Sequence, residues 1–233
     1  MALAMASAPS LTSGVGSTRT TSSFTPPDGS LIVALCGFTQ WDQPANVSAS
    51  GGGLTWTRRA WYNDGPAVAI FTAPRLTSGS MTVSVTSAHP GGDSGALKVL
   101  VFTGADLSAV GASNTGDSNT SNLTVAAYTS TRAGSWGVGV AADWNASGSP
   151  TSSDVAYPWH ISEELSGVVV HKASATPIAG TPVTLNFNGG SGGSRWWAWA
   201  ALEILPTEEE GAGPLRLVQV INSVPVHHRA ATW

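Results

Sequence analysis

The stretch Asp28-Gly29-Ser30-Leu31-Ile32-Val33 returns in altered form about 105 residues later, as Ala133-Gly134-Ser135-Trp136-Gly137-Val138. Each copy is a turn-forming Gly-Ser pair that leads into apolar residues, which is typical of a buried β-strand entered from a tight turn. Each copy is followed by a Trp, at Trp41 and Trp144. Recurrence of both features at nearly one offset indicates an internal pseudo-repeat.

The match continues in order along both halves of the chain. A second Trp pair, Trp56 and Trp159, has the same offset as the first. Three strand-like pairs follow: Ala67–Ile70 with Val168–His171, Met81–Val85 with Val183–Phe187, and Leu97–Phe102 with Trp197–Leu202. The series predicts pseudo-repeats at about 17–104 and 110–206. Either each half closes its own sandwich or the halves interleave into one jelly roll. Because no charged or Pro-rich linker separates the halves, we expect one domain over 17–206.

Composition favours an all-β protein. Charged residues make up 10% of the chain, against a usual ~25%, and Ser, Thr and Gly are abundant. The 42% apolar content and 10 Trp argue against disorder. We predict a jelly-roll-like antiparallel β-sandwich. Strands are expected at 17–24, 30–39, 54–62, 66–73, 80–87, 96–103, 121–128, 134–142, 155–161, 167–173, 182–187 and 196–205.

Charge and cysteine content narrow the function classes. The net charge is −4 and the few cations are scattered, whereas nucleic-acid binders carry a basic stripe. The chain contains no run of 18 apolar residues, so membrane insertion is not expected. A single cysteine, Cys36, excludes an internal disulfide and a thiolate zinc site. We expect synthesis in a reducing cytoplasm, no nucleic-acid partner and no cofactor.

Few side chains suggest catalysis. Asp42 and Asp143 flank the paired Trp41 and Trp144, and two carboxylates across a cleft are what a glycoside hydrolase needs. Aspartate at a strand-to-loop junction is also ordinary turn chemistry, so we expect no catalytic site. Trp41 and Trp144 are expected at the rim, where they contact a glycan or a protein partner, unless they plug the sandwich ends.

Other Trp and His residues have simpler interpretations. Trp197 and Trp199 share one face of a strand, with Trp196 on the other, and we expect the first two in the core. His160 and His171 are expected to face each other across a hairpin. Packing is a more common role for such a pair than metal binding, so no metal site is predicted.

The ends of the chain differ from its middle. Residues 1–16 are interpreted as an N-terminal arm. Pro206 ends the last strand and the acidic, Gly-containing segment 207–214 is interpreted as a linker. Residues 215–233 form an extended tail with apolar, β-prone residues that need a partner, either their own domain or another subunit by strand addition. The apolar residues of this assembly tail are Leu215, Leu217, Val218, Val220, Ile221, Val224 and Trp233.

Three segments carry a family resemblance: Pro26-Pro27-Asp28-Gly29-Ser30-Leu31-Ile32-Val33-Ala34-Leu35, Leu54-Thr55-Trp56, and Trp199-Ala200-Ala201-Leu202-Glu203-Ile204-Leu205-Pro206. They are similar to a β-sandwich domain in structural proteins of tailed bacteriophages, especially those of actinobacteria. Such proteins are often minor tail proteins, and some decorate capsids. The resemblance implies a jelly-roll-like virion component without catalytic residues.

The expected function is therefore non-enzymatic. We expect a minor tail or tail-tip protein of a virion that forms homo-oligomers, binds other virion proteins and contacts the host surface. The alternatives are a capsid decoration protein, a module that binds a host cell-wall glycan through Trp41 and Trp144, and a glycan hydrolase that uses Asp42 and Asp143.

Overall fold

The computed structural model describes residues 1–39, 47–88, 94–144, 148–189 and 196–208. These residues form sixteen strands. Within the described ranges no helix is long and apolar enough to cross a membrane. The predicted tail, 215–233, and the rim residues Trp41 and Asp42 lie outside the described residues.

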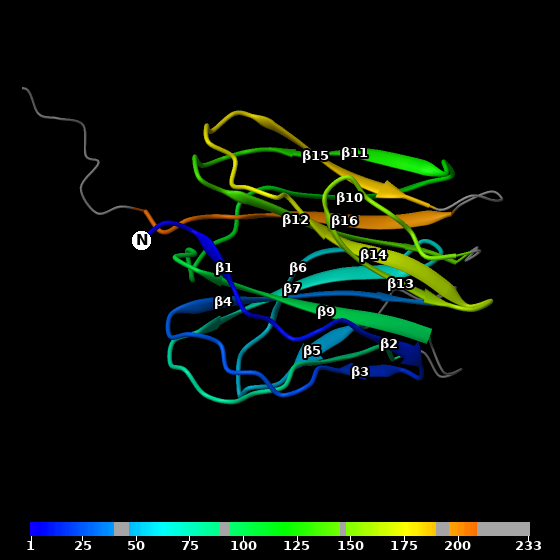
Figure 1. Ribbon diagram of the computed structural model, residues 1–233, viewed down its shortest axis with the longest axis horizontal. Coiled ribbons are helices and arrows are strands. Elements are labelled where there is room, and N and C mark those ends of the chain that lie inside the picture. The colour runs from blue at the N-terminus through cyan, green and yellow to red at the C-terminus, as the bar shows by residue number, and fades with distance from the viewer. Residues whose placement is uncertain (40–46, 89–93, 145–147, 190–195, 209–233) are drawn as a thin grey trace, which may run out of the picture.

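Two large antiparallel sheets form the centre of the molecule (Figure 1). The first has the order β1-β9-β4-β7-β6, with β2 also paired to β9; its strands are β1 (Ala4–Ala6), β2 (Thr12–Val15), β4 (Ser30–Phe38), β6 (Thr57–Tyr62), β7 (Ala67–Arg75) and β9 (Ser94–Thr103). The second has the order β10-β16-β12-β14-β13; its strands are β10 (Ser113–Ser118), β12 (Trp136–Asp143), β13 (Val155–Ile161), β14 (Leu165–His171) and β16 (Trp197–Ile204).

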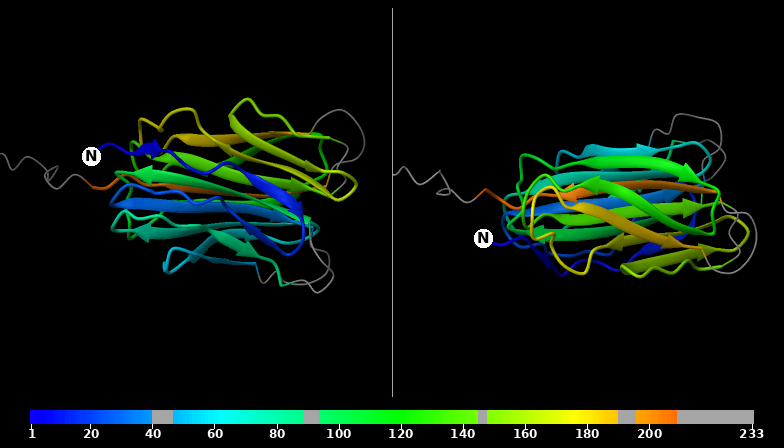
Figure 2. Two further views of the ribbon diagram at one scale, coloured as in Figure 1. Left: turned by 60° about the horizontal axis from the view of Figure 1, so that its bottom comes forward. Right: turned by 90° about the horizontal axis from the view of Figure 1, so that it is seen from above.

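A small sheet covers the outer face of each large one, so the molecule has four layers (Figures 1 and 2). On the first large sheet lie β3 (Thr18–Thr20), β8 (Ser84–Thr86) and β5 (Ser48–Ser50), and on the second lie β11 (Asn122–Thr129) and β15 (Pro182–Asn188). Every pairing between named strands is antiparallel; the pairs are β1–β9, β2–β9, β4–β9, β4–β7, β6–β7, β3–β8, β5–β8, β10–β16, β12–β16, β12–β14, β13–β14 and β11–β15. The predicted antiparallel β-sandwich is confirmed.

Three hydrophobic cores separate the four layers. In β4, Leu31, Val33 and Leu35 point into the core between the two large sheets. The alternate residues Ile32 and Ala34 point into the core beneath the small sheet. A third core lies between the second large sheet and β11–β15. A strand buried on both faces is apolar throughout, which explains why the central strands show no period-2 alternation.

The two halves repeat one strand order. In each large sheet the order begins with an edge strand, continues with the last strand of that half, and ends with an adjacent hairpin, β6–β7 or β13–β14. An isolated bridge, Thr151 to Asn188, occupies the place of the β5–β8 pair in the second half. Named strands pair only within their own half. Each half therefore closes its own jelly-roll-like sandwich, and the shared middle core joins the two.

One sequence equivalence is wrong. Trp56 packs in the outer core beneath the small sheet, whereas Trp159 is buried in the middle core. Trp159 on β13 lies opposite Gly167 on β14. The equivalent position in the first half is Tyr62 on β6, which lies opposite Val68 on β7. The loops between equivalent strands differ in length, so matching offsets in sequence do not mark matching positions in space.

The segment interpreted as an arm contains two strands. β1 and β2 pair with successive parts of β9 and cover the edge of the first large sheet. Between them, the ammonium of Lys98 donates a hydrogen bond of 2.6 Å to the carbonyl of Pro9. Short strands β5 and β10 are also absent from the sequence prediction, because edge strands such as Ser113–Ser118 carry few apolar residues.

Candidate functional site

Two partly exposed indoles lie where β12 ends and β16 begins. Asp143 lies opposite Trp197 in the antiparallel register, so Trp144 and Trp196 are the next residues on these neighbouring strands. Trp144 is 37% exposed and Trp196 is 40% exposed. The Trp196 ring lies against Gly65 in the turn between β6 and β7, where an added Cβ would be 3.9 Å from the indole. This residue therefore spans both halves.

Asp143 holds this arrangement in place. Its side chain is buried, and Oδ1 accepts a hydrogen bond of 2.9 Å from the backbone N–H of Trp196. A buried carboxylate needs such donors, since an unsatisfied charge in the interior is costly. Asp143 was predicted as a rim residue beside a glycan. The structure gives it a positioning role beneath the rim, and its predicted partner Asp42 lies outside the described residues.

The Trp-rich strand divides as its alternation predicts. Trp197 and Trp199 are 0% and 8% exposed and pack in the outer core, which confirms the prediction for both. Trp196 is the rim residue that the prediction did not select. The strand alternation could have identified it, because Trp196 directly precedes β16 and lies on the face opposite Trp197. Partly exposed indoles of this kind stack on sugar rings or anchor protein partners.

The opposite end of β16 fixes the point where the chain leaves the sandwich. Thr207 N–H donates to the carbonyl of Gly104 at 2.9 Å, and Pro206 forms a β-bridge with Ala105. The N-terminus lies at the same end (Figures 1 and 2). The short segment after β16 runs outward beyond the ends of the sheets (Figures 1 and 2).

Arg132 joins this exit segment to the connection between the halves. Its guanidinium donates to the carbonyl of Pro206 at 2.6 Å and to Glu208 Oε1 at 2.9 Å. It also forms an ion pair of 3.2 Å with Asp106. Hydrogen bonds to the Asp106 carboxylate, first from the Ser108 hydroxyl and also from Arg132, hold the pKa of Asp106 below its usual range. The exit is thus held by charged and backbone contacts together.

Glu203 is a buried carboxylate near the end of β16, three residues before Pro206. Its Oε1 accepts from Thr131 N–H at 2.8 Å, and its Oε2 accepts from Thr131 Oγ1 at 2.7 Å and from Ala112 N–H at 2.9 Å. Burial acts to raise the pKa of Glu203, but the polar groups of Ser135, Ala112 and Thr131 around the carboxylate outweigh it and the pKa is lowered. Glu203 ties β16 to the start of β10 and to the turn before β12.

Two hollows flank the exit. One, of about 690 Å³, is lined by Met1, Leu3, Ala133, Gly134, Ala175 and Pro206, among others. The other, of about 860 Å³, includes Pro27, Gly29, Ala105, Leu107, Thr207 and Glu208. Thr207 and Glu208 line both. The exit segment therefore forms a wall shared by two neighbouring hollows.

The predicted facing pair of histidines is wrong. On the β13–β14 hairpin, His171 lies opposite Val155 and His160 lies opposite Ser166. His171 is buried, and its Nδ1 lies 2.7 Å from the carbonyl oxygen of Lys172. Burial lowers the pKa of His171. The alternation of the strand places His160 on the exposed side. Within the described ranges no three His, Cys, Asp or Glu side chains gather as metal ligands.

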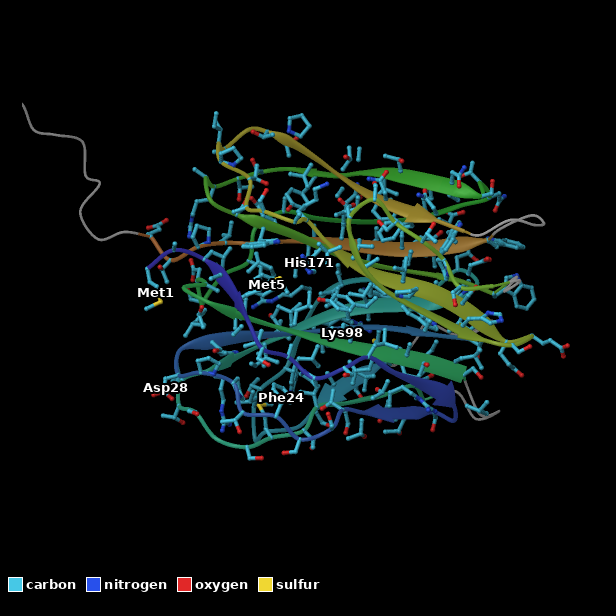
Figure 3. All side chains as sticks on the ribbon, viewed as in Figure 1. Met1, Met5, Phe24, Asp28, Lys98 and His171 are labelled. Atoms are coloured by element: carbon cyan, nitrogen blue, oxygen red, sulfur yellow. The ribbon has the colours of Figure 1, made fainter. Side chains whose placement is uncertain are left out.

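A buried polar group does lie between the large sheets. The Lys98 ammonium sits 4.3 Å from the centroid of the Tyr157 ring, and the Tyr157 hydroxyl lies 3.4 Å from His171 Nε2. Figure 3 shows Lys98 and His171 near the middle of the molecule, on opposite large sheets. Burial lowers the pKa of Lys98. Since Lys98 donates to the Pro9 carbonyl, this cluster attaches the N-terminal segment to the seam between the halves.

Comparison of the chain with protein-family models, with curated proteins and with solved structures finds no match. The two ends of β16 carry the features of the molecule that bear on its function.

Proposed function

We propose that this chain is a non-enzymatic structural subunit of a bacteriophage virion, made in the host cytoplasm. Within the particle it is a minor tail or tail-tip component that binds other virion proteins, and the alternative position is a capsid decoration. The proposal is supported by the four-layer β architecture, by the low content of charged residues and by the resemblance of the strand sequences to phage structural proteins.

The observation that carries the proposal is the fixed exit of the chain. Arg132 and the Gly104 carbonyl hold Pro206 and Thr207 at one end of the sandwich. The residues that follow are acidic and then apolar. An apolar segment presented from a rigid end is suited to docking on another subunit. This arrangement supports an assembly role for residues 215–233.

The test is incorporation into particles. A phage that lacks its own copy of the gene is supplied with either the full chain or a chain that ends at Glu208, and purified particles are probed with an antibody against the sandwich. We expect the full chain in particles and the shortened chain absent from them, with immunogold label on the tail of the phage particle. Equal incorporation of both chains would refute the assembly role of the tail.

The indole pair favours a second candidate function, binding of a host cell-wall glycan. Trp144 and Trp196 offer two partly exposed rings, and Asp143 accepts a hydrogen bond from the backbone N–H of Trp196. Because the Asp143 carboxylate is buried and hydrogen-bonded, the geometry supports glycan binding better than hydrolysis with Asp42.

Glycan binding is tested by titrating cell-wall fragments while tryptophan fluorescence is followed. Trp144→Ala should weaken binding at least about tenfold, and Trp61→Ala is the matched control, since Trp61 is equally exposed but stacks with Arg58 on β6. No fluorescence change at millimolar glycan would remove this candidate.

A further inference from the structure

We infer that the two hollows beside the exit receive residues 215–226 from a second copy of this chain, so that two copies exchange tails reciprocally. The inference rests on the proposed assembly role of the tail. It adds the surface that the tail binds and the identity of its partner.

The hollows have the size and lining of a docking surface. Their volumes, about 690 and 860 Å³, lie within the ~300–1,000 Å³ of typical binding pockets. Ala133, Ala175 and Leu3 give the first an apolar lining, and Pro27, Ala105 and Leu107 do so for the second. Aliphatic side chains are the groups that gain most from burial in such places.

The chemistry of the tail complements this surface. Residues 215–226 contain no Asp or Glu, and their apolar side chains are Leu215, Leu217, Val218, Val220, Ile221, Val224 and Val226. The acidic part of the chain ends before them, and its first carboxylate, Glu208, pairs with Arg132 at the wall between the hollows. Glu208 is thus held on the end face of its own chain, and the apolar side chains of 215–226 match the apolar linings of the two hollows.

The direction of the exit favours a second copy over the chain's own hollows. The hydrogen bond from Thr207 and the bridge of Pro206 hold the chain on the end face, and the segment that follows β16 runs outward beyond the ends of the sheets (Figures 1 and 2). Thr207 and Glu208 already line both hollows, so residues 215–226 would have to turn back to enter the hollows of their own chain, whereas the end face of a two-fold related copy lies ahead of them. Residues 209–214 span at most about 20 Å, which is enough to cross between two facing ends. Such an exchange is an isologous contact that closes at two copies.

The test uses the full chain with a photoreactive benzoylphenylalanine at Val218. We expect light scattering to show a dimer, and irradiation to give a species of twice the chain mass with its crosslink at the end-face segments 131–134, 173–177 or 104–108. Excess peptide of residues 209–233 should convert the dimer to monomer. A crosslink within one chain, or a crosslink to another surface, would overturn the inference.

Two matched variants separate the surface from the fold. Ala133→Trp fills the first hollow and should raise the dimer dissociation constant at least about tenfold, with Leu107→Glu acting in the second hollow. Ala126→Trp makes the same change at an exposed alanine on β11 and should leave the dimer unchanged. An unaltered dimer in both hollow variants, with native circular dichroism, would overturn the inference.

The outcomes distinguish this inference from the proposed function. A monomeric full chain that still needs residues 209–233 to enter particles would overturn tail exchange and leave the virion role standing. If the full chain forms the tail-exchanged dimer but the chain that ends at Glu208 enters particles equally well, the docking surface is supported and the assembly role of residues 215–233 is removed.

Discussion

Replacing Glu203 by Gln should destabilise the fold strongly although the change is nearly isosteric. The Glu203 carboxylate accepts three hydrogen bonds from Thr131 and Ala112. Hydrogen bonds to a charged group contribute about 1.5–3 kcal/mol each, and a buried donor left without an acceptor costs about 1–3 kcal/mol. Either orientation of the Gln amide places its NH₂ against a donor. We therefore expect the free energy of unfolding to fall by about 2–3 kcal/mol, a decrease in Tm of about 5–10 °C.

The pH dependence of that loss gives an independent check. The pKa of Glu203 is lowered in the fold, so its contribution is complete above the unfolded-state value of about 4.3 and is lost as pH falls through the lower folded value. The difference between wild type and variant should therefore narrow below about pH 4.

The assay is urea denaturation at pH 7 and at decreasing pH, with Glu164→Gln at an exposed turn as the control. A loss of unfolding free energy in Glu203→Gln as small as that in the control, or one that does not change with pH, would contradict the role given to the Glu203 carboxylate.

Three further perturbations test the cores. Gly167→Ala would place a methyl group against the Trp159 ring and should cost about 1–3 kcal/mol; Gly148→Ala, where an added Cβ meets open space, should change thermal unfolding little. Lys98→Met removes a buried ammonium, so global stability should change by less than about 1–2 kcal/mol, while amide exchange in the N-terminal segment should accelerate; unchanged exchange would contradict the attachment. Burial raises the pKa of Cys36 to about 12, so Ellman's reagent at pH 8 should react only as fast as the protein unfolds, and rapid reaction in native buffer would contradict its burial.

The local pattern of residues was sufficient to place the interior strands. The runs at Leu31 and Leu97 and the alternation at Val183 and Leu185 reflect burial on two faces or on one, and such burial leaves a direct record in sequence. The repeated Gly-Ser turns likewise indicated two equivalent halves, because an identical turn and strand need similar residues. Edge strands such as Ser113–Ser118 left no comparable record, since their outer positions are free to be polar.

The residue pattern alone was enough to assign the β-sandwich class, the internal repeat and the burial of Trp197 and Trp199. The folded arrangement was needed to show that the halves stack as four layers, that Trp159 and Trp56 face different cores, and that Asp143 supports Trp196. The difference lies in the range over which the interactions act. Period and turn chemistry act between neighbours in the chain, whereas stacking, loop length and the satisfaction of a buried carboxylate depend on groups that meet only after the chain has folded.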